Sequence, residues 1–330
     1  TSYASSGTII DNISPIIFHI FSFSRYKSSL IYARSFIKLI STNINKNTFF
    51  YSSFTSKFII ELNNLIINKT EEIKLNLPEL ISLIFSFLSR SSEYCLPELF
   101  LIPENLQFWL PNSMTKFNLI SIDTHHYLKF LSNLPKFLSK LKDIEAFKVL
   151  IGEIVSYAQH SLLNIQSNLL SIKLFYMLLH FNLIDVPNDF LPILLKVVIL
   201  PQFTTDNIIE TYDGRSISIW KDPHDAAICL FGELLRTDKR MIQLYYSLFQ
   251  SEAFKDSNEI SSALDLLSFF TSQFYEFDPQ TFCSFLAVIG SSIESNELLT
   301  ISFLKVLSKI KPNNRLPPEF LLGAASFAFS

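Results

Sequence analysis

The 330-residue chain is 48% hydrophobic and 17% charged, and its formal net charge at pH 7 is −3. This near-neutral balance gives no overall reason to expect nucleic acid as a partner, because nucleic-acid binding depends on basic surfaces. The chain contains only six glycines, whereas the tight turns of sheets and phosphate loops rely on glycine for positive φ angles. The composition therefore favours helices over sheets and phosphate-binding loops.

The apolar content of the chain is high enough to be compatible with membrane-spanning segments. The most apolar window, residues 169–186, is interrupted by Lys173, His180 and Asn182. The uncharged stretch 279–293 is shorter than the roughly 20 residues that a membrane-spanning helix needs. The first residues lack the basic region of a signal peptide. We therefore expect no membrane insertion.

The first part of the chain predicts short helices separated by polar turns. Residues 1–13 are expected to be frayed, and residues 14–142 to form an irregular helical part. Four Pro-Glu pairs precede apolar runs, as is typical of helix starts, where proline fits the first position and the helix dipole favours glutamate. The pairs are Pro78-Glu79, Pro97-Glu98, Pro103-Glu104 and Pro318-Glu319. The helices expected before residue 143 are 15–23, 26–40, 49–67, 78–89, 97–101, 104–110, 123–131 and 134–141.

Residues 143–330 predict more regular helix pairs. The helices expected here are 143–160, 166–180, 189–200, 222–235, 239–249, 259–274, 280–290, 294–310 and 317–329. Asp256 resembles the start of a capping box, and Asp278-Pro279 repeats the Asp-Pro helix start found at residue 222. Successive pairs begin near residues 222, 257 and 295, a spacing of roughly 35 to 40 residues that is typical of HEAT, armadillo and related repeats.

These elements predict an all-α fold. We expect an α-solenoid of antiparallel helix pairs, HEAT- or armadillo-like, that forms a right-handed superhelix. It should be a single helical-repeat domain over residues 1–330. Since the chain does not begin with methionine, we expect either a fragment of a longer solenoid or a processed chain.

The segment from Trp220 carries the clearest helix start. Asp222 can serve as N-cap, Pro223 suits the first helical position, and Asp225 places negative charge where the helix dipole favours it. His224 lies beside Asp225, but polar residues are ordinary in a first helical turn. Trp220 is interpreted first as a core or repeat-junction anchor and second as a partner contact.

The helix that follows has one broad apolar face. Its members recur at helical spacing and begin with small residues, which let a neighbouring helix approach closely. They are Ala226, Ala227, Leu230, Phe231, Leu234 and Leu235. We predict that this face packs between helices.

Residue patterns for catalysis and cofactor binding are not evident in the sequence. It contains no G-x-G and no G-x-S-x-G motif, and its three cysteines, Cys95, Cys229 and Cys283, are not in zinc-ligand spacing. We expect these cysteines to be buried reduced thiols. The adjacent His125 and His126 would point about 100° apart on a helix and would not converge on a metal. We therefore expect a protein that is not an enzyme and that carries no cofactor and no metal.

Four lysines form a candidate anion-binding site. Lys136, Lys140, Lys142 and Lys148 could form a basic stripe. Such a stripe is more often a solvated face, and an anion-binding site remains the alternative.

The Trp220 region resembles the importin-β superfamily of HEAT-repeat nuclear transport receptors, in either of two alignments. In the first, Trp220-Lys221, Asp225-Ala226-Ala227 and Gly232 are similar to a recurring HEAT helix of importin β. In the second, the apolar run Leu195 to Pro201 followed by Trp220-Lys221-Asp222-Pro223 resembles the middle of the larger importins and of the importin-α exporter. Lys221 and His224-Asp225-Ala226 stand here where the larger importins carry acids and an acid–aromatic pair.

This resemblance implies a role in nucleocytoplasmic protein transport. The expected partners are transport cargo, Phe-Gly nucleoporins and the Ran GTPase, and the expected location is the cytoplasm and nucleus, with enrichment at the nuclear envelope. Trp220, Asp222, Pro223, His224 and Asp225 are then candidate partner contacts. The alternative is a HEAT or armadillo scaffold subunit of a multiprotein assembly.

Overall fold

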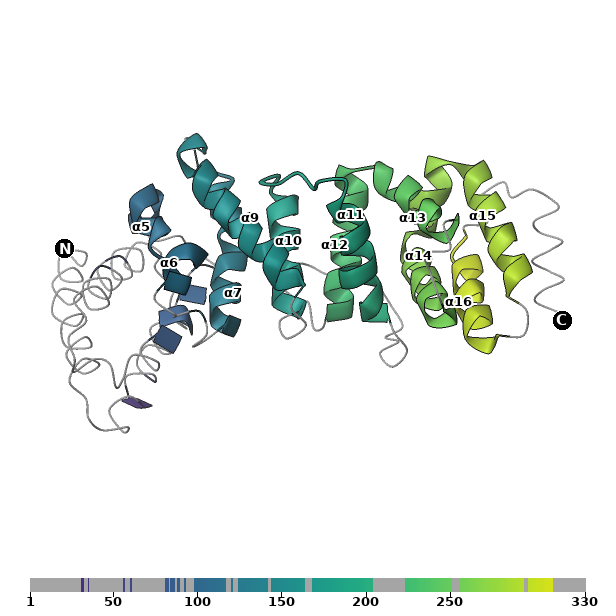
Figure 1. Cartoon of the computed structure of the whole chain (residues 1–330), viewed down its shortest axis with the longest axis horizontal. Coiled ribbons are helices and arrows are strands. Elements are labelled where there is room, and N and C mark those ends of the chain that lie inside the picture. Colours follow the sequence, from purple (N-terminus) through teal and green to yellow (C-terminus); the bar gives the residue numbers. More distant parts are fainter. Residues whose placement is uncertain are drawn as a thin grey trace, which may run out of the picture. The chain divides into compact units, whose positions relative to one another are not determined.

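The computed structural model is mainly helical in its described parts (Figure 1). It describes residues 98–116, 120, 124–141, 144–163, 168–203, 223–250, 256–293 and 296–310, and single positions between residues 31 and 92. Helix accounts for 85% of the described residues, and no strand occurs among them. This confirms the all-α prediction. The chain divides into two compact units, Thr1–Ile184 and Asp185–Ser330.

From residue 98 onward, the described part of the first unit contains several short helices and two long ones. They are η3 (Glu98–Leu101), α5 (Pro103–Gln107), α6 (Pro111–Lys116), α7 (Thr124–Asn133), α8 (Pro135–Leu138), η5 (Glu145–Phe147), α9 (Lys148–Leu162) and α10 (Asn168–His180). Proline opens α5, α6 and α8, because a first-turn residue has no intrahelical use for its N–H. The predicted start at Pro103-Glu104 is confirmed. Pro78-Glu79 and Pro318-Glu319 lie outside the described residues.

Helix α10 packs against α7, α9 and α8 in the first unit. Its residues are buried on nearly every side, including Leu174, Phe175 and Leu178, none of which is exposed. A helix that is apolar on most sides is expected where several neighbouring helices cover it. Asn182, with φ of 53°, ends it in a left-handed conformation that asparagine tolerates. There the N–H of Leu183 donates to the carbonyl of Leu178 at 2.9 Å.

The described part of the second unit contains three short helical segments followed by longer helices. They are α11 (Phe190–Ile193), η7 (Leu194–Ile199), η8 (Leu200–Phe203), α12 (Pro223–Thr237), α13 (Arg240–Gln250), α14 (Ser257–Phe277), α15 (Pro279–Ser292) and α16 (Glu297–Ser308). Helix α14 packs along α16 and contacts η8, α15 and α12. Among the described residues of the whole chain, no helix combines the length and hydropathy that a bilayer crossing requires.

Side-chain caps fix the starts of the last three helices. Asp256 accepts from the N–H of Glu259 at 2.8 Å, as the capping-box pattern predicts. Asp278 accepts from the N–H groups of Gln280 and Thr281, both at 3.1 Å. Asn296 caps α16, which begins slightly later than the predicted residue 294. The Asp-x-x-Glu and Asp-Pro signals therefore mark true helix starts.

The helix expected over residues 189–200 is not regular. Only Phe190–Ile193 is α-helical, and the chain continues as the π-helix η7 and the 3₁₀-helix η8. The N–H of Leu200 accordingly donates to Leu195, five residues back. Pro201, which has no N–H and cannot extend an α-helical ladder, lies inside η8. The prediction of a single α-helix ending before Pro201 is therefore wrong.

Several side-chain hydrogen bonds between helices join residues that lie 40 to 44 positions apart in the sequence. In the first unit, Glu153 on α9 accepts from the N–H of Asn112 on α6, 41 residues earlier. Asn133 on α7 donates to the carbonyl of Ser89, 44 residues earlier, and to the hydroxyl of Ser92, 41 residues earlier.

The second unit shows the same separation between α14 and α16. Ser261 and Ser302 form a hydrogen bond across 41 residues, and Asp265 pairs with Lys305 across 40. Because the paired positions advance together, α14 and α16 run in the same direction.

Candidate functional site

The residues predicted around the Asp222 helix start are only partly described. Pro223 is the first residue of α12, as predicted, whereas Trp220 and Asp222 lie outside the described residues. His224 and Asp225 are half-buried in the first turn. The ring centroid of His224 lies 4.5 Å from that of Phe203 in η8 and 5.9 Å from that of Phe269 on α14. His224 therefore contributes to packing between three elements of the second unit.

The apolar face of α12 is buried. Leu230, Phe231 and Leu234 have no exposed surface, and Leu235 is 2% exposed. The Phe231 ring lies 5.1 Å from that of Phe270 on α14, at an angle of 69° that favours an edge-to-face contact. This confirms the predicted packing face and leaves no open groove along it.

A glycine on α12 allows this close approach. A Cβ atom at Gly232 would lie 3.1 Å from Cε1 of Phe270. Gly290 on α15 is related in the same way to Phe303 of α16, where the distance would be 3.2 Å. Small residues therefore permit aromatic rings of neighbouring helices to pack directly on the helix backbone.

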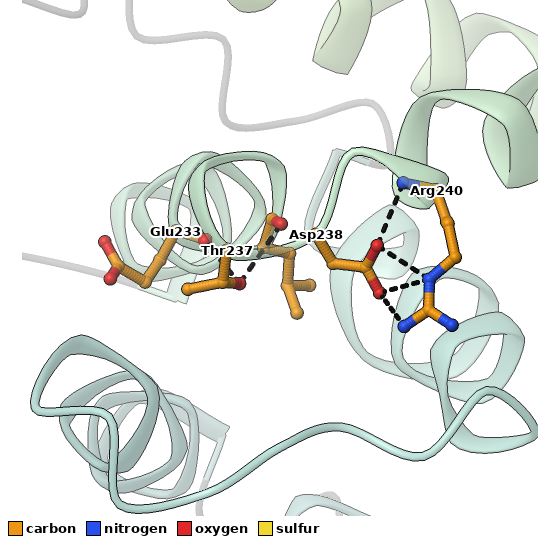
Figure 2. A network of polar contacts seen from close by, with 5 residues as sticks. Glu233, Thr237, Asp238 and Arg240 are labelled. Atoms are coloured by element: carbon orange, nitrogen blue, oxygen red, sulfur yellow. Dashed lines mark hydrogen bonds and ion pairs between the residues drawn. The ribbon is translucent and has the colours of Figure 1, made fainter.

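The corner between α12 and α13 is held by a polar network (Figure 2). The carboxylate of Asp238 accepts from the backbone N–H of Arg240 at 2.9 Å and from its Nη2 at 2.6 Å. These hydrogen bonds from Arg240 hold the pKa of Asp238 below its ordinary value. The hydroxyl of Thr237 donates back to the carbonyls of its own helix, to Glu233 at 2.9 Å and to Leu234 at 3.2 Å. The network stabilises a helix corner.

A buried carboxylate in the last turns of α12 was not among the predicted site residues. The side chain of Glu233 is 7% exposed, and one of its oxygens accepts from Nε of Arg236 at 2.9 Å and from Nη2 at 2.5 Å. The Glu–Arg spacing of three residues was the available signal, because such residues share a helix face. Burial of Glu233 depends on neighbouring helices and cannot be read from that spacing.

The three described lysines of the predicted basic stripe lie in different surroundings. Lys136 in α8 is half-buried, with its Nζ atom 5.6 Å from the centroid of the Phe137 ring. Lys148 begins α9 and pairs with Glu145 at 3.4 Å, with both side chains 76% exposed. Lys140 is exposed, and Lys142 lies outside the described residues. The neighbouring acid and the exposure favour a solvated face over an anion site.

The first unit contains a cluster of polar and aromatic groups that sequence reasoning missed. Tyr127 on α7 donates to the carbonyl of Trp109 at 3.0 Å, and its ring lies 5.9 Å from that of Tyr157 on α9. Glu153, one turn before Tyr157, accepts from the backbone N–H of Asn112 in the first turn of α6.

The titration of these groups reflects their burial. Burial raises the pKa of Tyr157 to about 12 and that of Tyr127 well above its ordinary value. It also raises the pKa of Glu153, and the hydrogen bonds from Asn112 offset this only in part. The tyrosines therefore remain protonated at neutral pH, and the cluster acts as a contact between α6, α7 and α9.

The structure describes both adjacent histidines and two of the three cysteines. The rings of His125 and His126 are nearly perpendicular, at 88°. Cys283 is buried, which raises its pKa, and Cys229 is half-buried; neither is in a disulfide. Cys95 lies outside the described residues. Within the described ranges, no group of three or more His, Cys, Asp or Glu residues could hold a metal ion.

Comparisons of the chain with protein-family models, with curated proteins and with solved structures gave no match.

Proposed function

We propose that this chain is an α-solenoid of antiparallel helix pairs of the HEAT or armadillo type, and that it binds other proteins. The observation that carries the proposal is the recurring separation of 40 to 44 residues between hydrogen-bonded positions on neighbouring helices. HEAT and armadillo repeats have a length of about 40–47 residues. In a stack of such repeats, equivalent helices of successive repeats lie side by side, as α14 and α16 do.

Repeat stacking supports a binding role because it leaves extended surfaces. Each repeat contacts only its neighbours, so the outer helix faces remain available to partners. Aliphatic side chains occur on such faces: Val149 on α9 is 81% exposed, Val197 in η7 is 55% exposed, and Val288 on α15 is 64% exposed. They would supply apolar contacts on helices of both units.

The first version of this function is a nuclear transport receptor. It rests on the resemblance of the Trp220 region to the importin-β superfamily, with cargo, Phe-Gly nucleoporins and Ran as partners and the nuclear envelope as the site of enrichment. Shallow apolar sites would each accept one phenylalanine ring. Burying one such ring contributes only about 1.5–3 kcal/mol, so useful affinity must come from several sites acting together.

Titration with Phe-Gly repeat peptides tests this version. Fluorescent peptides of increasing repeat number, with Ser-Gly peptides of equal length as control, are added to the whole chain. Binding that rises steeply with the number of Phe-Gly repeats, and is absent for Ser-Gly, supports the transport role. Val149→Ser and Val288→Ser should weaken binding, whereas the exposed polar substitution Gln243→Ser should not. Equal signals from the two peptide series would remove the transport role.

The second version of this function is a scaffold subunit of a multiprotein assembly. The hydrogen bond and the ion pair between α14 and α16 favour it. The Ser261–Ser302 and Asp265–Lys305 pairs fix the spacing of these helices, and a fixed surface suits a lasting complex. A pull-down from cell extract distinguishes the two versions. Recovery of Ran and nucleoporins supports transport, whereas a constant set of other proteins in fixed ratio supports the scaffold.

A further inference from the structure

We draw no further inference here: the strongest candidate, the exposed stripe of Val149, Gly152, Ser156 and Leu163 along one side of α9, is an unpartnered apolar face, and nothing in the structure shows what covers it.

Discussion

Lys305 on α16 donates to Asp265 on α14 at 3.0 Å, one helical turn from the hydrogen bond that joins Ser261 to Ser302. The Lys305 and Asp265 side chains are 32% and 15% exposed, and both serines are buried. Two polar interactions therefore join α14 to α16. Each interaction satisfies groups whose burial would otherwise destabilise the fold.

Removing one serine of the buried pair should cost stability. Ser302→Ala leaves the hydroxyl of Ser261 buried without this partner, so we expect the free energy of unfolding to fall by about 1–3 kcal/mol. The double variant Ser261→Ala with Ser302→Ala removes both polar groups and should lose less than the sum of the single losses. Urea unfolding of the four proteins measures this. Additive losses would contradict direct coupling between the two hydroxyls.

Ser308→Ala is the matched control for that experiment. Ser308 is exposed on the same helix, and its hydroxyl donates to the carbonyl of Lys305 within its own turn. Exposed substitutions of this kind usually change stability by less than about 0.5 kcal/mol.

Two glycines should respond differently to alanine. A Cβ atom at Gly152 on α9 would meet nothing within 4 Å, whereas one at Gly232 would press on Phe270. Gly152→Ala should raise the free energy of unfolding by roughly 0.5–1 kcal/mol through helix propensity. Gly232→Ala makes the same chemical change in a packed interface, and it should be about 1–3 kcal/mol less stable than Gly152→Ala. Similar gains in thermal unfolding experiments would argue against close packing of α12 on α14.

Local signals along the chain predicted much of the second unit. Asp256, Asp278 and Pro223 mark helix starts because capping depends on residues within one turn. The apolar face of α12 followed from helical spacing alone. These features are decided by neighbours in the sequence, and the structure contains them where they were expected.

Features that depend on distant residues could not be predicted in this way. The contact of Glu153 with Asn112 joins positions 41 residues apart, and only the packing of α9 on α6 brings them together. In the sequence, Lys136 and Lys148 are equivalent positive charges. In the structure, Lys136 lies over the ring of Phe137, whereas Lys148 pairs with Glu145. The π-helical turn at 194–199 has an ordinary helical pattern in its sequence, so periodicity gave no sign of it.

Truncating a leucine on the buried face of α12 should be severe. Leu230 has no exposed surface, so Leu230→Ala should lower the free energy of unfolding by about 2–5 kcal/mol, through lost transfer energy and a cavity. Leu304→Ala on α16 removes the same atoms from a side chain that is 38% exposed, and its loss should be clearly smaller. A loss below about 0.5 kcal/mol for Leu230→Ala would mean that this face does not pack between helices.

Glu153 should make the free energy of unfolding depend on pH, because burial of its carboxyl group raises its pKa. Its pKa is raised in the folded protein, so the folded state holds the proton more tightly than the unfolded state does. The stability that Glu153 contributes is therefore present at acidic pH and is lost as the pH rises through the raised pKa.

Glu153→Gln keeps an oxygen that can accept from the N–H of Asn112 and carries no charge, so it removes this part of the pH dependence. Glu153→Ala removes the acceptor as well, and it should be less stable than Glu153→Gln by about 1 kcal/mol at every pH. Urea unfolding of the three proteins from acidic to neutral pH checks both statements. A wild-type protein whose stability, relative to Glu153→Gln, increases towards neutral pH would show that the hydrogen bond outweighs the burial of the carboxylate.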